Sequence, residues 1–230
     1  MKIVIIGGHL TPALAVIEKI PKEWEILFVG RKYAMEEDRE VSLEYQTIND
    51  LGINFVDLGA GRLQRSFSRY TIPSLFRIPK AYLKSLQILR NFKPDVILGL
   101  GGYVSVPVVI SGKILGIPAV IHEQTLNAGR SNRILSNFSD KICVSWKSSV
   151  GYFPKDKTVL TGNPVRRNFF EPTDLPEGID PLIFIFGGST GSHAINLLTE
   201  QIIDKLLEKY RVLHLCGTND FEMTFVITFI

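Results

Sequence analysis

The sequence predicts an α/β protein with a Rossmann-like parallel sheet in its N-terminal domain and the incomplete start of a second Rossmann-like domain. Three observations support this. Short β-type runs alternate with stretches of helical periodicity. The runs are continuously apolar, which is typical of strands buried on both faces of a parallel sheet. Several of them end in glycine-rich turns that lead into a helix.

The elements follow one another in regular order. Apolar runs bounded by turn residues predict strands at 2–6, 25–30, 54–58, 95–100, 119–123, 141–146, 158–162, 182–188 and 211–217. Helical spacing of apolar residues predicts helices at 12–20, 78–91, 104–115 and 194–210. Pro12 opens the first of these helices, where a missing backbone N–H costs nothing. Strands that alternate with helices predict βαβ units.

The segment 169–181, FFEPTDLPEGIDP, interrupts this alternation. It carries three prolines, one glycine and four acidic residues, a composition typical of a linker. We therefore expect a first domain over 1–168 and part of a second over 182–230. The second part has only about 50 residues, too few for a complete sheet of βαβ units. The apolar ending FEMTFVITFI predicts that the chain is truncated at its C-terminus.

Composition narrows the class of protein. The net charge of +3 argues against a general nucleic-acid binder, so no nucleic-acid partner is expected. Cys143 and Cys216 lie far apart in apolar runs, which predicts buried free thiols and a reducing cytoplasm. No apolar run reaches the about 18 residues expected of a membrane span.

The stretch 62–94 is unusual because it contains eight basic residues and no acidic residue. A run of charge is usually a solvated face. Here large apolar side chains are interleaved with the cations, which favours contact with an anionic membrane surface. The residues expected to face that surface are Arg69, Leu75, Phe76, Arg77 and Lys80.

Three glycine-rich turns follow predicted strands, at 7–9 (GGH), 99–103 (GLGGY) and 187–191 (GGSTG). Each places bare backbone N–H groups at a helix N-terminus, where phosphate binds well. Any one of them could be a plain structural turn. None matches a Walker loop or a clean G-x-G-x-x-G pattern, so a nicotinamide or flavin cofactor is not expected.

Three blocks carry a family resemblance. GLGGYVSVPVVISGKILGIPAVIHEQTLNAGRSNRILSNFSDKI begins at Gly99 and is followed by TGNPVRR and then by GGSTGSHAIN. In order and spacing these blocks resemble the bacterial MurG glycosyltransferases, and the similarity covers residues 1 to about 219. The resemblance implies the two-domain GT-B fold. It also implies inverting transfer of N-acetylglucosamine from UDP-GlcNAc to the undecaprenyl-diphosphate-linked muramyl-pentapeptide, on the cytoplasmic face of the bacterial cell membrane, as a peripheral protein.

The resemblance assigns His9 as the general base that takes a proton from the acceptor's sugar hydroxyl. A histidine can accept a proton at neutral pH, so the chemistry fits. The alternative is a turn histidine that bonds local backbone. The family's loop usually reads GGTGGH, whereas this chain has GGH and is three residues shorter.

The resemblance also implies an acceptor-binding set. Backbone at the first two glycine turns is expected to approach the acceptor diphosphate, and polar groups after the strand at 119–123 to contact the acceptor. These residues are Gly7, Gly8, Gly101, Gly102, Glu123, Gln124, Thr125 and Asn127. For Glu123 the alternative role is a hydrogen-bonding scaffold that fixes its loop.

The donor side is expected at the third glycine turn and at the arginine of TGNPVRR. The implied UDP-GlcNAc ligands are Arg166, Gly188, Ser189 and Gly191. Backbone amides and an arginine can stabilise a diphosphate leaving group, and no Asp-x-Asp metal motif is present. No cofactor beyond the UDP-sugar substrate is therefore expected.

The family continues well past residue 230, so the chain alone is expected to be impaired as a transferase. Two alternatives remain open. One is a non-catalytic fragment that binds a lipid diphosphate or a membrane, and the other is a GT-B glycolipid synthase. The HEQ and TGNPVR motifs argue against the glycolipid synthase.

Overall fold

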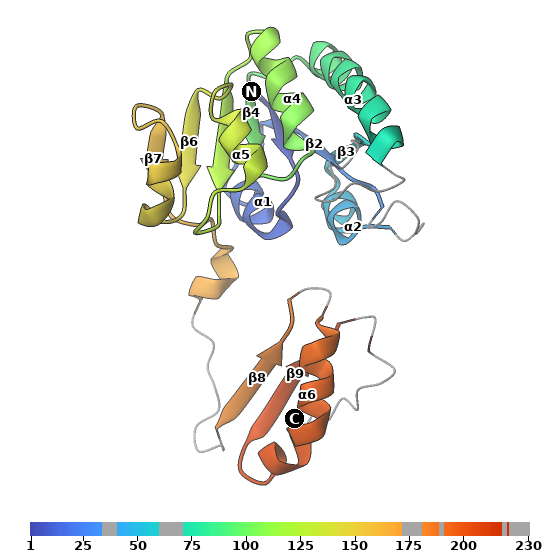
Figure 1. Ribbon diagram of the computed structural model, residues 1–230, viewed down its shortest axis with the longest axis vertical. Coiled ribbons are helices and arrows are strands. Elements are labelled where there is room, and N and C mark those ends of the chain that lie inside the picture. Colours follow the sequence, from blue (N-terminus) through green and yellow to red (C-terminus); the bar gives the residue numbers. More distant parts are fainter. Residues whose placement is uncertain (34–40, 60–70, 172–180, 189–190, 218–219, 221–230) are drawn as a thin grey trace. The chain divides into compact units, whose positions relative to one another are not determined.

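The computed structural model describes residues 1–33, 41–59, 71–171, 181–188, 191–217 and 220, and the side chains of 71–78 lie outside this description. The chain divides into two compact units, residues 1–171 and 172–230. Figure 1 shows the elements of each unit. Along the described part of the chain, no helix combines the length and the apolar character that crossing a membrane requires.

The first unit is built on a seven-stranded parallel sheet with the order β3-β2-β1-β4-β5-β6-β7. Its strands are β1 (Lys2–Ile6), β2 (Glu25–Gly30), β3 (Asn54–Asp57), β4 (Val96–Gly99), β5 (Ala119–Glu123), β6 (Lys141–Val144) and β7 (Thr158–Leu160). The strand order reverses between β1 and β4. At such a point the loops beyond the carboxyl ends of the strands diverge and leave a crevice for ligands.

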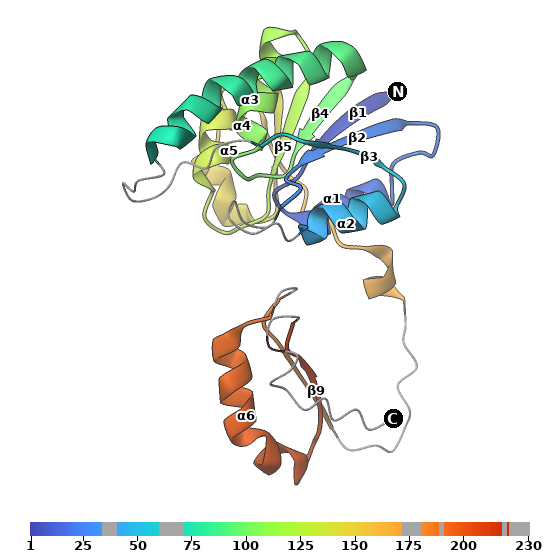
Figure 2. The ribbon, with the colours of Figure 1, turned by 90° about the vertical axis from the view of Figure 1, so that its right-hand side faces the viewer.

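Helices cover both faces of this sheet (Figures 1 and 2). The helices are α1 (Leu10–Ile17), α2 (Leu43–Asp50), α3 (Thr71–Phe92), α4 (Ser105–Ile114) and α5 (Arg130–Leu135), with short 3-10 helices η1 (Lys147–Tyr152) and η2 (Arg167–Phe170). In β1, Ile3 and Ile5 join the core under α1 and α2, while Val4 and Ile6 join the larger core under α3, α4 and α5. Successive side chains of a strand point to opposite faces of the sheet, so a strand with a core on each face needs an uninterrupted run of apolar residues.

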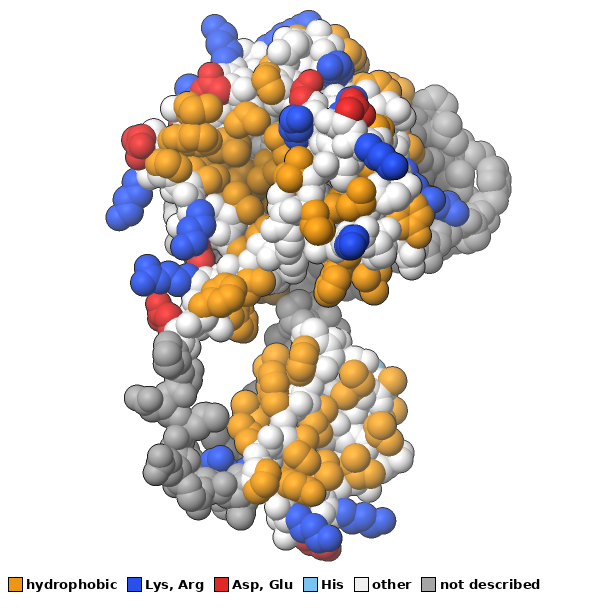
Figure 3. Space-filling model, turned by 90° about the vertical axis from the view of Figure 1, so that its left-hand side faces the viewer, with side chains coloured by type: hydrophobic (Ala, Val, Ile, Leu, Met, Phe, Trp, Pro, Cys, Tyr) orange, Lys and Arg blue, Asp and Glu red, His pale blue; other side chains and the backbone are white. Residues whose placement is uncertain are grey.

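The second unit contains β8 (Leu182–Phe186), α6 (His193–Leu207) and β9 (Arg211–Leu215). The two strands pair in parallel, with Leu182 opposite Arg211 and Phe186 opposite Leu215. Large apolar side chains of both strands remain exposed, and hydrophobic atoms spread over the face of this unit in Figure 3. The exposed strand residues are Leu182, Phe184, Phe186, Leu213 and Leu215.

The structure confirms the predicted α/β class and every predicted strand, with ends that are up to two residues shorter. The helix expected at 78–91 begins at Thr71 and continues through Pro79. The first helix spans 10–17 rather than 12–20. Two α-helices of the described residues, α2 and α5, were not predicted. In α2 only Ile48 is buried, and α5 is a helix of six residues, so neither gives a clear apolar period.

Candidate active site

His9 lies at the carboxyl end of β1, immediately before α1. Its Nδ1 is 2.9 Å from the carbonyl oxygen of Leu100, in the turn after β4. A carbonyl oxygen only accepts hydrogen bonds, so Nδ1 carries the proton and Nε2 of the neutral ring is the acceptor. Among the described residues none bonds to Nε2, and the side chain is exposed. The ring is thus oriented by the neighbouring turn with its basic nitrogen accessible.

The turns after β1 and β4 pack against each other backbone to backbone. A Cβ on Gly8 would lie 2.5 Å from the carbonyl oxygen of Gly101, and a Cβ on Gly102 would lie 3.2 Å from Gly8 Cα. All three glycines have positive φ, at 149°, 82° and 74°. Glycine is therefore required here for close approach as well as for conformation. The amides of Gly101 and Gly102 donate to no residue in the described part of the chain.

Glu44 is a residue of this site that the sequence did not reveal. It lies in the first turn of α2, and its carboxylate accepts hydrogen bonds from the amides of Gly8 and Arg31, each at 3.2 Å. A Cβ on Gly7 or on Gly30 would overlap this carboxylate. Burial raises the pKa of Glu44, and the two amide hydrogen bonds oppose that shift. Had the sequence predicted α2, the position of Glu44 in its first turn would have pointed to this residue.

Glu123 organises the loop that follows β5. Its side chain is 3% exposed. The carboxylate accepts hydrogen bonds from the amide and hydroxyl of Thr125 at 3.0 and 2.6 Å, from the amide of Gly129 at 2.9 Å and from Asn132 Nδ2 at 2.9 Å. Asn127 joins the same loop through Tyr152, whose hydroxyl donates to Asn127 Oδ1 at 2.9 Å. These contacts favour the scaffold role for Glu123.

Burial alone would raise the pKa of Glu123, but the hydrogen bonds from Thr125, Gly129 and Asn132 outweigh it and hold the pKa below its usual value. A lowered folded-state pKa stabilises the fold above the unfolded pKa, about 4.3, and this stabilisation is lost as the pH falls through the folded value. We expect Glu123→Gln to lower the free energy of unfolding by about 1–3 kcal/mol at pH 7. The loss should shrink as the pH falls below about 4.

Urea unfolding of both proteins at pH 7 and at acid pH measures this difference. Glu25→Gln is the matched control because Glu25 forms an exposed ion pair with Lys2 at 2.8 Å. Such pairs contribute less than about 1 kcal/mol. An equal effect of the two substitutions, or a Glu123→Gln penalty that does not change with pH, would contradict the scaffold role.

Gln124 connects the loop after β5 to the turn after β4, and through their shared acceptor to His9. Gln124 Nε2 donates to the Leu100 carbonyl oxygen at 3.2 Å, so this oxygen accepts from both Gln124 and His9. The indole Nε1 of Trp146 donates to the backbone carbonyl of Gln124 at 2.9 Å. The structure therefore brings His9, Gln124 and the Gly101 turn together at one edge of the sheet.

Three buried acceptor atoms near the end of β5 have no hydrogen-bond partner within the described residues: His122 Nδ1, Gln124 Oε1 and Asn132 Oδ1. Burial lowers the pKa of His122, and its Nε2 is 3.1 Å from the Gly162 carbonyl oxygen. Nε2 therefore carries the proton and Nδ1 is an acceptor. Buried polar atoms are normally satisfied, so these acceptors suit a ligand or water that supplies hydroxyl donors.

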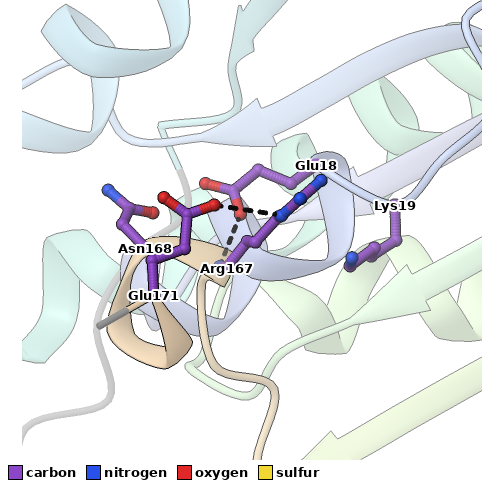
Figure 4. Close-up of a pocket in the computed structure, with 5 residues that line it drawn as sticks. All are labelled: Glu18, Lys19, Arg167, Asn168 and Glu171. Atoms are coloured by element: carbon purple, nitrogen blue, oxygen red, sulfur yellow. Dashed lines mark hydrogen bonds and ion pairs between the residues drawn. The ribbon is translucent and has the colours of Figure 1, made fainter.

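Arg166 lies elsewhere in the first unit, just before η2. Its Nε is 2.9 Å from Glu18 Oε1 on the segment after α1, and the amide of Arg167 donates to Glu18 Oε2 at 3.2 Å. In Figure 4 the Arg167 side chain meets the carboxylate of Glu171 and its backbone meets that of Glu18, in the shallow pocket that these residues line with Lys19 and Asn168. The hydrogen bond from Arg166 lowers the pKa of Glu18. Arg166 is thus paired with a carboxylate on its own unit.

The third glycine turn belongs to the second unit. Gly188 has φ +88°, and an ideal Cβ there would meet no atom of the described residues within 4 Å, so on that side the backbone is open to a ligand. Gly191 differs, because a Cβ there would overlap the Cys216 carbonyl group. Gly191 therefore serves close packing of the turn on β9. Ser189 lies outside the described residues.

A hydrogen-bonded cluster at the start of α6 was not singled out from the sequence. Asn196 Nδ2 donates to the Cys216 carbonyl oxygen at 2.9 Å and to Asp220 Oδ2 at 2.7 Å. Asn196 Oδ1 is 3.0 Å from His214 Nε2, and His193 Nδ1 is 3.1 Å from Asp220 Oδ1. Asn196 is buried and ties α6 to β9. The side-chain amide is central to this unit because it both donates and accepts.

We expect Asn196→Ala to lower the free energy of unfolding of the second unit by about 1–3 kcal/mol, because it leaves the buried Cys216 carbonyl without its donor. Hydrogen exchange of the β9 amides measures the loss. Thr199→Ala is the matched control, since the buried Thr199 hydroxyl donates only to the Ile195 carbonyl of its own helix, at 2.8 Å. Equal effects of the two variants would contradict the role of Asn196 as the hub.

The membrane-facing set is described only in part. Arg69 lies outside the described residues, and the side chains of Leu75, Phe76 and Arg77 do as well, although their backbone is part of α3. Lys80 is on the same helix and is exposed. Contact with a membrane therefore stays a prediction.

Comparison with known proteins decides the family. The sequence profile of the glycosyltransferase family 28 N-terminal domain matches residues 6–144. The chain belongs to glycosyltransferase family 28. The matched segment runs from the end of β1 to the end of β6, so it contains His9, the interlocked turns and the network around Glu123.

Proteins with a named activity are similar along nearly the whole chain. A UDP-N-acetylglucosamine--N-acetylmuramyl-(pentapeptide) pyrophosphoryl-undecaprenol N-acetylglucosamine transferase of Geobacter sulfurreducens is 38% identical over 229 residues, covering 94% of this chain and 60% of that protein. The enzyme of the same name from Lachnoclostridium phytofermentans is 32% identical over 228 residues, covering 95% and 62%. The chain spans about three fifths of the length of these relatives.

A solved structure supports the predicted architecture. The crystal structure of MurG from Acinetobacter baumannii matches 97% of this chain and 61% of its own chain, with a TM-score of 0.63 and 25% sequence identity. The Rossmann-like sheet of the first unit and this likeness confirm the predicted GT-B type of fold.

Proposed function

We propose that the chain contributes the acceptor half, and the first phosphate turn of the donor half, of an inverting N-acetylglucosamine transferase. The donor is UDP-GlcNAc and the acceptor is undecaprenyl-diphosphate-linked N-acetylmuramyl-pentapeptide, as the names of the relatives state for those proteins. The observation that carries the proposal is that the family match covers the segment in which His9 is oriented by Leu100.

His9 is the general base of the proposed reaction. Nε2 takes the proton of an acceptor sugar hydroxyl while that oxygen forms a bond to the anomeric carbon of N-acetylglucosamine. The bond from that carbon to the UDP oxygen breaks, and UDP leaves with the electron pair. The Leu100 carbonyl holds the Nδ1 proton, so Nε2 keeps its lone pair toward the acceptor.

The acceptor is proposed to bind at the carboxyl ends of β1, β4 and β5. Gly7 and Gly8 lie beside its diphosphate, the amides of Gly101 and Gly102 donate to it, and hydroxyl groups of the acceptor meet polar groups of the β5 loop. The unpartnered acceptor atoms of His122, Gln124 and Asn132 support this part of the proposal, because sugar hydroxyls supply the missing donors.

The donor's diphosphate is proposed to bind the third glycine turn and an arginine. The open backbone at Gly188 supports this, whereas Gly191 supplies the packing that shapes the turn. Ser189 belongs to the same proposed contact, and Arg166 would exchange its Glu18 partner for a phosphate. No cofactor besides the UDP-sugar is part of the proposal.

The site of action is proposed to be the cytoplasmic face of the bacterial cell membrane, with the protein bound peripherally. The basic and apolar stretch 62–94 supports this, since it carries eight cations and no acidic residue. A lipid-linked acceptor requires such a position. Arg69, Leu75, Phe76, Arg77 and Lys80 are the proposed membrane contacts.

The test is N-acetylglucosamine transfer and acceptor binding by a protein of this sequence. A short-chain polyprenyl-diphosphate muramyl-pentapeptide and a diacylglycerol are offered as acceptors, with labelled UDP-GlcNAc. We expect binding of the diphosphate acceptor with weak transfer to it. Transfer only to diacylglycerol would favour a glycolipid synthase, and binding of neither acceptor would contradict the proposal. Robust transfer would overturn the expectation that this chain alone is impaired.

A further inference from the structure

We propose that Glu44 is a positioning residue that holds the histidine turn in place. This inference rests on the proposed function only for the role of His9 as a base. Glu44 does not touch the proposed reacting atoms, and it acts through the backbone at Gly8. Nothing in the sequence pattern marked it, because it belongs to a helix with a single buried residue.

The carboxylate of Glu44 bridges two turns of the sheet edge. Oε1 accepts from the amide of Gly8, one residue before His9, and Oε2 accepts from the amide of Arg31, just after β2. Both distances are 3.2 Å. The β1 turn is thus held from one side by Glu44 and from the other by its contact with Gly101.

The sheet leaves a space of the right shape for this carboxylate. Gly7 directly follows β1 and Gly30 is the last residue of β2, and a Cβ on either residue would overlap Glu44. The Glu44 carboxylate therefore occupies the space that side chains at these two positions would fill. The titratable groups that face it are the Arg31 side chain and the His9 ring, and the positive charge that either can carry favours its ionised form.

The chemistry of a carboxylate fits two amide donors. An ionised carboxylate only accepts, so each oxygen can meet one N–H. A glutamine in the same place presents one acceptor and one donor, so one backbone N–H would face an NH₂ group. Glutamine is consequently not equivalent to glutamate here, although its size is the same.

The hydrogen bond from the Gly8 amide to Glu44 gives the turn at 7–9 and the turn at 99–103 different roles. The Gly8 amide is already satisfied by Glu44, whereas the amides of Gly101 and Gly102 donate to no described residue. Because an unsatisfied N–H gains most from an anion, the diphosphate contact falls on the second turn. The short GGH loop therefore serves to place His9, and the GLGGY turn receives the diphosphate.

The experiment compares the protein of this sequence with Glu44→Ala and Glu44→Gln by ¹⁵N NMR of the His9 ring. In the unmodified protein we expect the Nδ1–H form to predominate, because Nδ1 donates to Leu100. In both variants the Nε2–H form should become the major one. Asp95→Asn is the matched control, since Asp95 accepts the Lys2 amide at 2.7 Å at the opposite end of the sheet.

Retention of the Nδ1–H form in both Glu44 variants would overturn the proposal, as would an equal change in Asp95→Asn. Should Glu44→Ala fail to fold, Glu44→Gln decides alone, with its melting curve recorded alongside. None of these readouts requires transfer, so their failure is distinct from failure of the proposed reaction.

Titration with inorganic pyrophosphate tests the division of roles. In the unmodified protein the amide signals of Gly101 and Gly102 should shift while that of Gly8 stays. In Glu44→Ala, pyrophosphate should also shift the Gly8 signal, because its donor is then unpaired. A shift of the Gly8 amide signal in the unmodified protein would show that pyrophosphate displaces the Glu44 carboxylate from this amide. That result would overturn the positioning role.

Discussion

Replacement of His9 by alanine is expected to lower the rate of N-acetylglucosamine transfer by about 10²–10⁴-fold, the range typical of a lost general base. The substitution removes the imidazole whose Nε2 is left accessible as a base by the hydrogen bond from Nδ1 to the Leu100 carbonyl. The measurement is kcat with labelled UDP-GlcNAc. It is made in the protein of this sequence and, in parallel, at the matching loop histidine of the Geobacter sulfurreducens relative.

His9→Asn separates the base from the packing role. Asparagine can still donate from its side-chain amide to the Leu100 carbonyl, but an amide does not accept a proton at neutral pH. We expect His9→Asn to lose as much of kcat as His9→Ala, with acceptor binding kept in both. A His9→Asn variant that retains most of the activity would assign His9 to packing alone.

Gly8→Ala is expected to lower the free energy of unfolding of the first unit by about 2–6 kcal/mol. The estimate combines about 1–3 kcal/mol for a side chain in an unsuitable backbone conformation with a similar cost of overpacking. The new Cβ would lie 2.5 Å from the Gly101 carbonyl oxygen and force apart the turn after β1 and the turn after β4. His9 would lose its alignment with Leu100, so transfer should fall as well.

Gly52→Ala is the matched control for this steric effect. Gly52 also has a positive φ, 69°, but a Cβ there would meet no atom within 4 Å in the part of the chain that the structure describes. Its cost should be only the conformational term, about 1–2 kcal/mol. Urea unfolding of both variants gives the comparison. If Gly8→Ala cost no more than Gly52→Ala, the two turns would not be packed as described.

The sheet was predictable because its strands are buried on both faces. Runs such as KIVII at 2–6 cannot alternate when helices cover each side, and that pattern identifies a parallel sheet. The helix α2 was not predictable in the same way. It rests on one buried side chain, Ile48, and on an N-cap in which Ser42 accepts the Tyr45 amide. Such a helix depends on tertiary contacts more than on its own apolar period.

The candidate site was predicted in outline, and the partners of its residues were not. The sequence placed His9 and the GLGGY turn at strand ends, and parallel strands bring such ends to one edge. It could not show that Leu100 orients the histidine ring, because the two residues are 91 positions apart. The Glu44 contact was hidden for the same reason, since it joins α2 to the first turn across 36 positions.

Binding of the diphosphate-linked muramyl-pentapeptide to the protein of this sequence, mapped by amide NMR, tests the central claim most directly. The account predicts that the shifted signals gather at the turn after β4, in the β5 loop from Glu123 to Asn127 and at His9, and that Asp95 at the opposite end of the sheet stays unchanged. Shifts scattered away from these turns, or no binding, would contradict the assignment of this edge of the sheet as the acceptor site.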